Sequence, residues 1–395
     1  MKKEVKIIFH IDLNAFFATC SIIKEPYLAN KIFVVGGSAA MRKGVLSTAS
    51  YKARELGIKS GMSIHEALNI YPQLLVVPLD FKLYHKQSMI FFNFLNKYSN
   101  LILKGSIDEA YVDMTELSKT RHPLEIAKEI QDTLYKEYKL PVSIGIGPTL
   151  FLAKMASELK KPLGITVIRR RDIEEKILPL PIKDMFGIGK KTAPLLVERG
   201  ILTIGDFLKK ENKSKILEIM KLPMYESYIE HILGYSSDVV DPKKYAIPKS
   251  VTNETTLNFP IDQTDLVINE IKEMFSIAYD RLISDELIAK GVTIKFKTKD
   301  FKLITRSQVL NDYTDERDIL YHAIEELVEQ HYKNEPVRLI GCGFYQVMQK
   351  RDLKIDYNLF TYDTMSKREN DLFRVMDSIN KKYPDSVKKG VKDKI

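Results

Sequence analysis

Short apolar runs alternate with helical patterns over the first 170 residues. The run VKIIFHI (5–11) has the length and β-branched composition of a buried strand, and KIFVVGG (31–37) is a second one that ends at two glycines. In HPLEIAKEIQDTLYKEY (122–138) the apolar residues recur at helical spacing. Further strand-like segments are LILKGSI (101–107), AYVDMT (110–115) and PVSIGIG (141–147). The order of these elements predicts a sheet covered by helices in an α+β unit.

The pattern changes near residue 171. Short apolar helices joined by glycine turns predict a small all-helical unit up to about residue 237, and a stretch rich in Ser, Pro, Asp and Lys (235–250) predicts a linker. A second mixed unit is expected over about 248–346. In its segment VTIKFKTKD, apolar residues 292, 294 and 296 alternate with Thr293, Lys295, Lys297 and Lys299, so one face should be core and the other a row of lysines.

From about residue 347 the chain is highly charged, and we expect a tail with one helix near 366–382. The full length of 395 residues predicts two to four folding units. We see no internal repeat.

Composition favours a nucleic-acid partner. Lysine and arginine number 61 against 52 aspartate and glutamate residues, which gives a formal charge of +9. A basic balance favours a polyanion, nucleic acid before membrane, although a solvated basic surface is the alternative. The two cysteines, Cys20 and Cys342, lie far apart in apolar surroundings, so neither a disulfide framework nor a cysteine zinc site is predicted and a reducing cytoplasm is expected. No segment approaches the length of a membrane span, and His10 and Asp12 interrupt the first apolar run too early for a signal peptide.

Acidic residues stand at the ends of predicted strands. Asp12 ends the first apolar run, and Asp108 and Glu109 lie between two strands of the same predicted sheet. Neighbouring residues in a strand point to opposite faces, so both can approach Asp12 only if the chain bends there. Three converging carboxylates would need a cation, and oxygen ligands favour Mg²⁺. The alternative is that Asp12 caps the following helix and that the other two lie on a solvated hairpin.

Candidate phosphate ligands accompany these acids. Tyr51 and Arg54 are three apart on a predicted helix, hence on one face, and Lys161 ends the predicted helix FLAKMASELKK just before Pro162. A triphosphate beside metal ions would need such cationic donors. Taken singly, each is more typical of a surface charge or a helix end than of a ligand.

A glycine hairpin, Gly187-Ile188-Gly189, is predicted to open a helix with Lys190 and Lys191 in its first turn. Backbone N–H groups at such a helix start can hold a DNA phosphate without reading sequence. The alternative is an ordinary helical corner.

Five segments together resemble the Y-family DNA polymerases, most closely the bacterial DinB type. They occur in the family's order and spacing over about residues 5–346: HIDLNAFFA, STASYKARELGIKSGMS, SIDEAYVDMT, SIGIGPTLFLAKMASELKKPLGI and FGIGKKT. The resemblance implies a right-hand α+β polymerase with the following parts: a palm (1–22 and 81–170), small fingers (23–80), a helical thumb with a helix-hairpin-helix (171–237), a linker (238–247), a separate α+β little finger (248–346) and a charged tail (347–395).

The resemblance also implies the activity. A low-fidelity translesion polymerase would add deoxynucleotides to a primer 3′-hydroxyl on a DNA template, using two Mg²⁺ ions and no proofreading exonuclease. Primer–template DNA and deoxynucleoside triphosphates would be its partners, and a monomer is expected. The rival classes are a DNA-binding relative that has lost its chemistry and a nucleotidyl cyclase on a palm-like fold.

By the same resemblance, Asp12, Asp108 and Glu109 are the catalytic metal ligands, and the Leu13 carbonyl adds another. Phe17 is the steric gate that rejects a ribose 2′-hydroxyl. The nucleotide site would comprise Phe16, which is also expected in the core, with Phe17, Tyr51, Arg54 and Lys161. The DNA contacts would be Gly187, Gly189, Lys190, Lys191, Lys295, Lys297 and Lys299.

Some positions depart from the family pattern. Asn14 replaces a common aspartate, Ser21 replaces a glutamate, and Thr149 and Leu150 replace an Asn-Lys pair; Asp113 is expected to be structural. None of these changes removes a predicted metal ligand.

The tail segment DYNLF (356–360) resembles the family's sliding-clamp peptide, with Asp356 where glutamine is usual. Leu359 and Phe360 would be its apolar anchors. The alternative is a tail that folds back onto the little finger.

Overall fold

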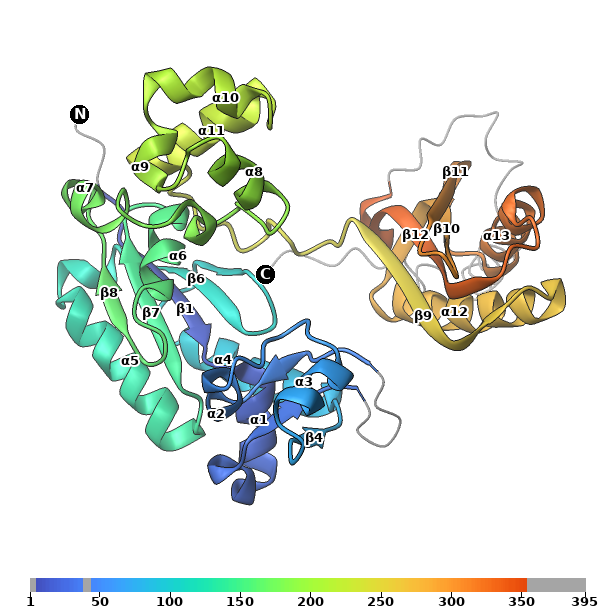
Figure 1. Ribbon diagram of the computed structural model, residues 1–395, viewed down its shortest axis with the longest axis horizontal. Coiled ribbons are helices and arrows are strands. Elements are labelled where there is room, and N and C mark those ends of the chain that lie inside the picture. Colours follow the sequence, from blue (N-terminus) through green and yellow to red (C-terminus); the bar gives the residue numbers. More distant parts are fainter. Residues whose placement is uncertain (1–4, 38–43, 354–395) are drawn as a thin grey trace, which may run out of the picture. The chain divides into compact units, whose positions relative to one another are not determined.

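The computed structural model describes residues 5–37 and 44–353 (Figure 1). The chain divides into two compact units between Ala246 and Ile247, within the two to four that its length predicts. Among the described residues no helix has the length and apolar character needed to cross a membrane. The predicted tail helix at 366–382 and the clamp-like segment with Leu359 and Phe360 lie outside the described residues.

A five-stranded sheet forms the centre of the first unit, in the order β5-β6-β1-β7-β8. The central strand β1 pairs antiparallel with β6 and β7, and β7 pairs parallel with β8. The bounds are β1 Ile8–Leu13, β5 Ile102–Lys104, β6 Glu109–Asp113, β7 Val142–Gly147 and β8 Ile165–Val167. The sequence pattern predicted all of these except β8, which has only three residues.

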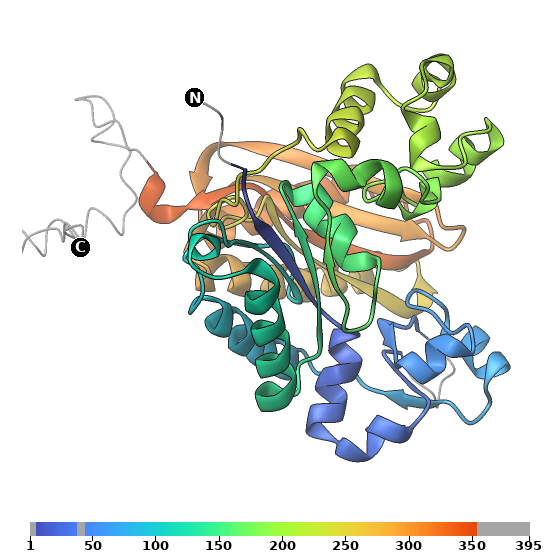
Figure 2. The same cartoon turned by 90° about the vertical axis from the view of Figure 1, so that its left-hand side faces the viewer.

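The two faces of this sheet differ in chemistry. On β1, Phe9 and Ile11 point into a large apolar core, whereas His10 and Asp12 point to the opposite face. Helices α1 (Phe16–Lys24), α4 (Phe81–Leu95) and α5 (Pro123–Tyr138) contribute to the same core. Helix α6 (Leu150–Glu158) covers the other face, and Figure 2 shows α5 and α6 on opposite sides of the sheet. The polar residues of the sheet therefore face α6.

Helix α6 lies unusually close to β7. A Cβ atom placed on Gly145 would be 2.0 Å from the carbonyl oxygen of Ala153, so only glycine fits at this strand position. The outer side of α6 belongs to a second core, because Phe151, Leu152 and Met155 pack with the helices that follow. Met155 Sδ also accepts a hydrogen bond from the backbone N–H of Phe186 at 3.3 Å.

Those following helices confirm the predicted all-helical segment. They are α7 Ile173–Lys176, α8 Thr192–Glu198, α9 Ile204–Phe207, α10 Lys213–Leu217 and α11 Leu222–Leu233. Among the described residues no helix or strand lies between Leu233 and Ser250, as the predicted linker implies, although Val240 is buried against Ile8 and Leu103.

A small three-stranded sheet in the order β3-β2-β4 lies in the segment after α1. Its strands are β2 Phe33–Val35, β3 Thr48–Ala49 and β4 Leu75–Val77, and the last of these was not predicted. Helix α2 (Tyr51–Glu55) begins where the Ser50 side chain accepts a hydrogen bond from the N–H of Ala53. Ser63 and Glu66 form a capping box at the start of α3 (Ile64–Ile70).

The second unit is a four-stranded antiparallel sheet in the order β11-β10-β12-β9. Its strands are β9 Ser250–Ile261, β10 Leu287–Thr298, β11 Leu303–Thr314 and β12 Val337–Gln349, with helices α12 Thr264–Ser284 and α13 Arg317–His331. Val292, Ile294 and Phe296 are buried in the core between sheet and helices, as their alternation predicts. Strand β12 runs past the expected start of the tail because Val347 pairs with Ala289 and packs against this core.

Candidate active site

The polar face of the five-stranded sheet gathers the predicted carboxylates. Asp12 on β1 pairs in register with Glu109 on β6, so both side chains point toward α6. Asp108 precedes β6, and its carbonyl accepts a hydrogen bond from the N–H of Leu13 at 2.9 Å. The chain turns before β6, which is the bend that two adjacent carboxylates required.

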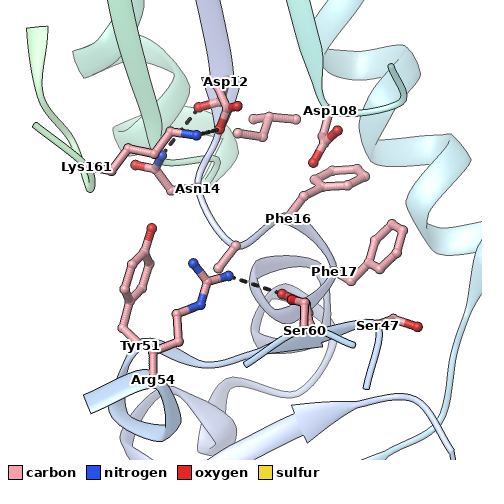
Figure 3. A pocket seen from close by; sticks show the side chains of 13 residues that line it. Asp12, Asn14, Phe16, Phe17, Ser47, Tyr51, Arg54, Ser60, Asp108 and Lys161 are labelled. Carbon is pink, nitrogen blue, oxygen red and sulfur yellow. Dashed lines mark hydrogen bonds and ion pairs between the residues drawn. The ribbon is translucent and has the colours of Figure 1, made fainter. Parts of the chain in front are cut away.

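Asp12 and Asp108 line one cavity of about 270 Å³, but Glu109 is not among its lining residues (Figure 3). Leu13 also lines it. Among the described residues no three Asp, Glu, His or Cys side chains are grouped closely enough to hold a metal ion. The structure thus brings two of the three predicted carboxylates together and leaves the third beside them.

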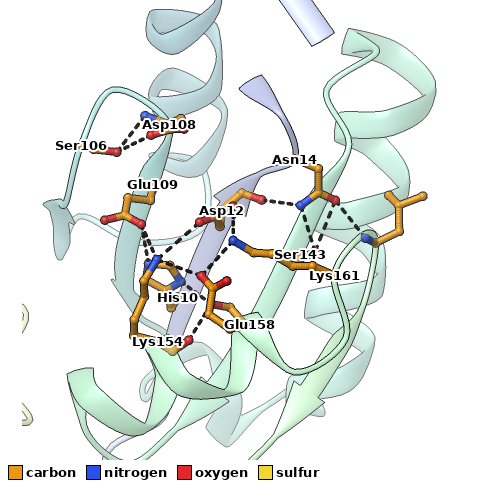
Figure 4. Close-up of polar contacts among 12 residues, drawn as sticks. His10, Asp12, Asn14, Ser106, Asp108, Glu109, Ser143, Lys154, Glu158 and Lys161 are labelled. Atoms are coloured by element: carbon orange, nitrogen blue, oxygen red, sulfur yellow. Dashed lines mark hydrogen bonds and ion pairs between the residues drawn. The ribbon is translucent and has the colours of Figure 1, made fainter. Parts of the chain in front are cut away.

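Glu109 is held by two other side chains (Figure 4). Its Oε2 atom lies 2.6 Å from Lys154 Nζ and 3.4 Å from His10 Nε2. The neighbouring His10 imidazole and the Lys154 cation lower the pKa of Glu109 to about 2, although burial opposes the shift. Burial lowers the pKa of His10, so the imidazole is neutral at pH 7. Glu109 is therefore a carboxylate that stays ionised.

Asp12 is held by a second lysine. Lys161 Nζ lies 2.8 Å from Asp12 Oδ1 and 2.8 Å from Glu158 Oε1, while Lys154 Nζ lies 3.1 Å from Glu158 and 3.5 Å from Asp12. Two lysines thus compensate three carboxylates. Lys154 is only 9% exposed, and its pKa is raised because the hydrogen bond and charge of Glu109 outweigh its burial.

Asp108 has no such partner. Its carboxylate accepts a hydrogen bond from Ser106, and it forms no ion pair within the described residues. Burial raises the pKa of Asp108, and the negative charges of Asp12 and Glu109 raise it further. This carboxylate is the one that a bound cation would stabilise most.

The predicted phosphate ligands lie in the same cavity as Asp12 and Asp108. Tyr51, Arg54 and Lys161 all line it, together with Ser47, Thr48 and Ser60, which the sequence reasoning missed. The Arg54 guanidinium donates to the Ala49 carbonyl at 3.0 Å and to the Thr48 hydroxyl at 3.2 Å, and it lies 5.1 Å from the centre of the Tyr51 ring. Burial raises the pKa of Tyr51, so its hydroxyl keeps its proton and can donate. The cavity has donors of the kind that phosphate oxygens need.

Two aromatic residues at the start of α1 complete the lining. Phe16 is 3% exposed and belongs to the core, as expected, while also touching the cavity. Phe17 is half-buried, and its ring stacks on that of Tyr84 with centroids 4.2 Å apart and planes at 17°. The stacking fixes the orientation of Phe17 in the cavity wall.

The positions that depart from the family pattern have structural contacts. The Asn14 amide donates to the Ser143 hydroxyl at 2.9 Å and accepts from the N–H of Leu163, which ties β1 and β7 to the loop after Lys161. The Ser21 hydroxyl donates to the Phe17 carbonyl, and Thr149 caps α6.

Asp113 also has the structural contacts expected of it. It forms an ion pair with Lys6 at 3.0 Å and accepts a hydrogen bond from the N–H of Thr115.

The glycine hairpin is present, with one difference. Gly187 has φ +95°, and its carbonyl accepts a hydrogen bond from the Tyr228 hydroxyl. Helix α8 starts at Thr192, so Lys190 and Lys191 lie in the turn before it rather than in its first turn as predicted. Thr192 and Ala193 donate instead to the Gly189 carbonyl. Gly187, Gly189 and both lysines are exposed.

The predicted row of lysines on the second unit is only partly a free cationic face. Lys295 and Lys297 point away from the core on β10, but Lys299 follows the end of that strand. Lys295 forms an ion pair at 2.6 Å with Glu254 on β9, a contact between residues 41 apart in the sequence. The alternation of residues within one strand cannot predict an ion-pair partner on another strand.

The sequence reasoning also missed Lys154, which contacts Asp12 and Glu109. Lys154 and Glu158 have the i, i+4 spacing that places both on one side of α6, and Lys161 follows three residues after the end of the helix. That charged stripe on a helix with an otherwise apolar sequence was the available signal.

Solved structures define the class to which this fold and site belong. A Y-family DNA polymerase chimera of Dbh and Dpo4 matches with a TM-score of 0.78 at 26% identity, covering 87% of this chain and 99% of the other. DinB from Sulfolobus solfataricus matches with a TM-score of 0.60 at 26% identity and the same coverage. The fold is that of a right-hand DNA polymerase with a separate C-terminal domain, as the sequence predicted.

Sequence comparisons define the family. Models of the impB/mucB/samB family and of its C-terminal domain match residues 11–158 and 248–357. DNA polymerase IV 1 of Bacillus subtilis is 36% identical over 97% of this chain and 92% of its own length, and DNA polymerase IV of Bacillus anthracis is 38% identical over 96% and 92%. The chain belongs to this family, the Y-family DNA polymerases, and is a DNA-directed DNA polymerase.

Proposed function

We propose that this chain carries out template-directed, low-fidelity translesion synthesis in the cytoplasm, adding deoxynucleotides to a primer 3′-hydroxyl. The observation that carries the proposal is the cavity that Asp12 and Asp108 line together with Tyr51, Arg54 and Lys161. Carboxylates for metal ions and donors for a triphosphate are thus adjacent, which the metal-assisted reaction of a nucleoside triphosphate requires.

The donor set fits Mg²⁺. Asp12, Asp108, Glu109 and the Leu13 carbonyl offer only oxygen atoms, the ligands that Mg²⁺ prefers, and Asp108 has a raised pKa with no ion-pair partner among the described residues. When bound, two such ions help to deprotonate the attacking hydroxyl and stabilise the leaving oxygen. We assign these four residues to hold them.

The chain's own residues bind and orient the nucleotide. Arg54 and Lys161 contribute positive charge toward the phosphates, and Tyr51 contributes a hydroxyl donor. Phe17, fixed by its stacking on Tyr84, forms the part of the wall against which the sugar packs. A ribose 2′-hydroxyl would meet this ring, so Phe17 selects deoxynucleotides.

We assign the parts of the fold as predicted. The five-stranded sheet with α6 is the palm, the three-stranded sheet with α2 and α3 the fingers, helices α7–α11 the thumb, and the second unit the little finger. The fingers are small, and the α-helices α2 and α3 among their described residues are short, which leaves little surface to check the nascent base pair and accounts for low fidelity and lesion bypass. We infer no proofreading exonuclease and a monomeric enzyme.

We propose that primer–template DNA is bound through its backbone. Gly187, Gly189, Lys190 and Lys191 form an exposed turn that would hold a phosphate, and Lys295, Lys297 and Lys299 would follow the backbone on the second unit. Leu359 and Phe360 are proposed as the anchors of a sliding-clamp contact.

The deciding experiment is primer extension with Mg²⁺ and all four deoxynucleotides, comparing the natural chain with Asp108→Ala. Extension by the natural chain and none by the variant, with primer–template binding nearly unchanged, is expected. Extension retained in Asp108→Ala would refute the site assignment. DNA binding without extension in either protein would indicate a non-catalytic binder, and template-independent turnover of a nucleotide would indicate a cyclase.

A further inference from the structure

Lys154 occupies the centre of the carboxylate network. Its Nζ lies 2.6 Å from Glu109, 3.1 Å from Glu158 and 3.5 Å from Asp12, and its side chain is 11% exposed (Figure 4). The proposed polymerase chemistry uses Asp12 and Glu109 but gives no role to Lys154 or Glu158. A buried lysine that touches two assigned metal ligands needs an explanation.

Glu109 sits in a socket outside the cavity. Oε2 faces Lys154 and His10, and Oε1 lies beside Gly105, where an added Cβ atom would come within 3.1 Å of it. Asp108, the adjacent residue, lines the cavity while Glu109 does not. The contacts with Lys154 and His10 account for this difference between neighbouring acids.

A metal ion and Lys154 compete for the Glu109 carboxylate. Its Oε2 atom accepts a hydrogen bond from the Lys154 ammonium group at 2.6 Å, so a cation of +2 charge binds this carboxylate more weakly unless that group moves away. Displacement would be very unfavourable if it left the buried ammonium unpaired. Glu158 removes this obstacle, because it lies four residues further along the same helix and already contacts Lys154 at 3.1 Å.

We propose that Lys154 is a positioning residue that latches Glu109 away from the cavity and releases it, by transfer to Glu158, when a metal ion enters. The inference rests on the proposed assignment of Glu109 as a metal ligand. The lysine keeps the metal-free carboxylates neutralised, and it makes metal binding weaker in the free enzyme than the three carboxylates alone would give. Occupation of the complete site then depends on the added charge of a bound triphosphate.

The test measures the affinity of the full chain for Mn²⁺ without DNA or nucleotide. Electron paramagnetic resonance reports the concentration of free Mn²⁺ in each titration. Lys154→Met should bind Mn²⁺ about tenfold more tightly than the natural chain, the effect of removing one charge-assisted hydrogen bond. Lys160→Met is the matched control: Lys160 is exposed nearby and has no ion pair among the described residues, so its affinity should change less than about twofold. Equal affinities of the Lys154 variant and the natural chain would overturn the latch.

A double-mutant cycle separates the latch from a general effect of charge. In a Glu109→Gln background, Lys154→Met should alter Mn²⁺ affinity less than about twofold, because the latched partner is gone. The same tenfold gain in both backgrounds would refute the proposal and indicate a long-range field. If Glu109→Gln leaves Mn²⁺ affinity unchanged in the Lys154→Met background, where the carboxylate is free to bind, the metal-ligand assignment fails instead. Lys154→Gln, which keeps a polar side chain, replaces the Met variant if the latter fails to fold.

Discussion

Gly145→Ala is expected to separate α6 from the sheet that carries the carboxylates. The new Cβ would lie 2.0 Å from the Ala153 carbonyl oxygen and 2.3 Å from the Ser157 nitrogen, whereas ordinary contacts start at 3.4 Å. To lengthen the Cβ–oxygen distance from 2.0 Å to the ordinary 3.4 Å, strand and helix must move apart by about 1.4 Å. Both atoms belong to backbone within a hydrogen-bonded helix, so no side-chain rotation relieves the clash.

The energetic consequence is overpacking in a close-packed interior, which costs about 1–3 kcal/mol. For a unit of this size, a loss of about 1 kcal/mol in the free energy of unfolding lowers Tm by roughly 2–4 °C. A cost of about 3 kcal/mol, the upper end of that range, therefore predicts a fall of about 6–12 °C. The same movement would stretch the 2.6 Å contact between Lys154 and Glu109, so Mn²⁺ affinity should rise as well.

Thermal unfolding followed by circular dichroism measures the effect. Gly189→Ala is the control, because its Cβ would have no atom within 4 Å and its φ is not in the left-handed region, so Tm should change by less than about 2 °C. A Gly145→Ala protein as stable as the control would show that α6 does not pack on β7 as described.

Three further predictions concern the site and the DNA contacts. Phe17→Ala should incorporate ribonucleotides at least tenfold more readily relative to deoxynucleotides, measured by single-nucleotide insertion; unchanged sugar discrimination would exclude the gate. Asp108→Asn should raise the Tm of the metal-free protein at pH 7 while abolishing extension. Because the pKa of Asp108 is raised in the folded protein, its ionised form destabilises the native state at neutral pH, and the protein recovers stability as pH falls through the folded pKa. The gain in Tm should therefore disappear at low pH. A lower Tm at pH 7 would contradict this sign. Replacing Lys295, Lys297 and Lys299 with Met should weaken binding to all DNA sequences alike and lower the slope of log K against log salt by about one per lost phosphate contact; a sequence-dependent loss would count against backbone tracking.

Much of the architecture was predictable because local patterns carried it. The alternation of Val292, Ile294 and Phe296 located a strand and its buried face, and β1 was predicted from a short apolar run that ends at an acid. β4 and β8, with three residues each, were missed, although the equally short β2 and β5 were predicted. Their place in a sheet is set by partners distant in the sequence.

In the candidate site, the motifs supplied the residue types but not their pairing. Asp12 and Asp108 meet in one cavity as the expected bend requires. The turn of Glu109 toward Lys154 depends on how closely α6 approaches the sheet, which in turn depends on Gly145. In isolation, a lysine on a predicted helix resembles a solvated surface charge, and only the tertiary packing shows that Lys154 is buried.

Helix α6 also restricts how related enzymes can exchange parts. One side of the helix places Lys154 beside the carboxylates, and the other places Phe151 and Met155 in the core of the helical segment. There Met155 Sδ accepts a hydrogen bond from the N–H of Phe186, next to the glycine hairpin. A recombination joint placed directly after α6 would set a foreign helical segment against the native surface of this helix. Chimeras that exchange α6 together with the helical segment would keep the interface between the two. They would, however, place a foreign α6 against the native carboxylates of the sheet. Viable hybrids should therefore match at both surfaces of this one helix.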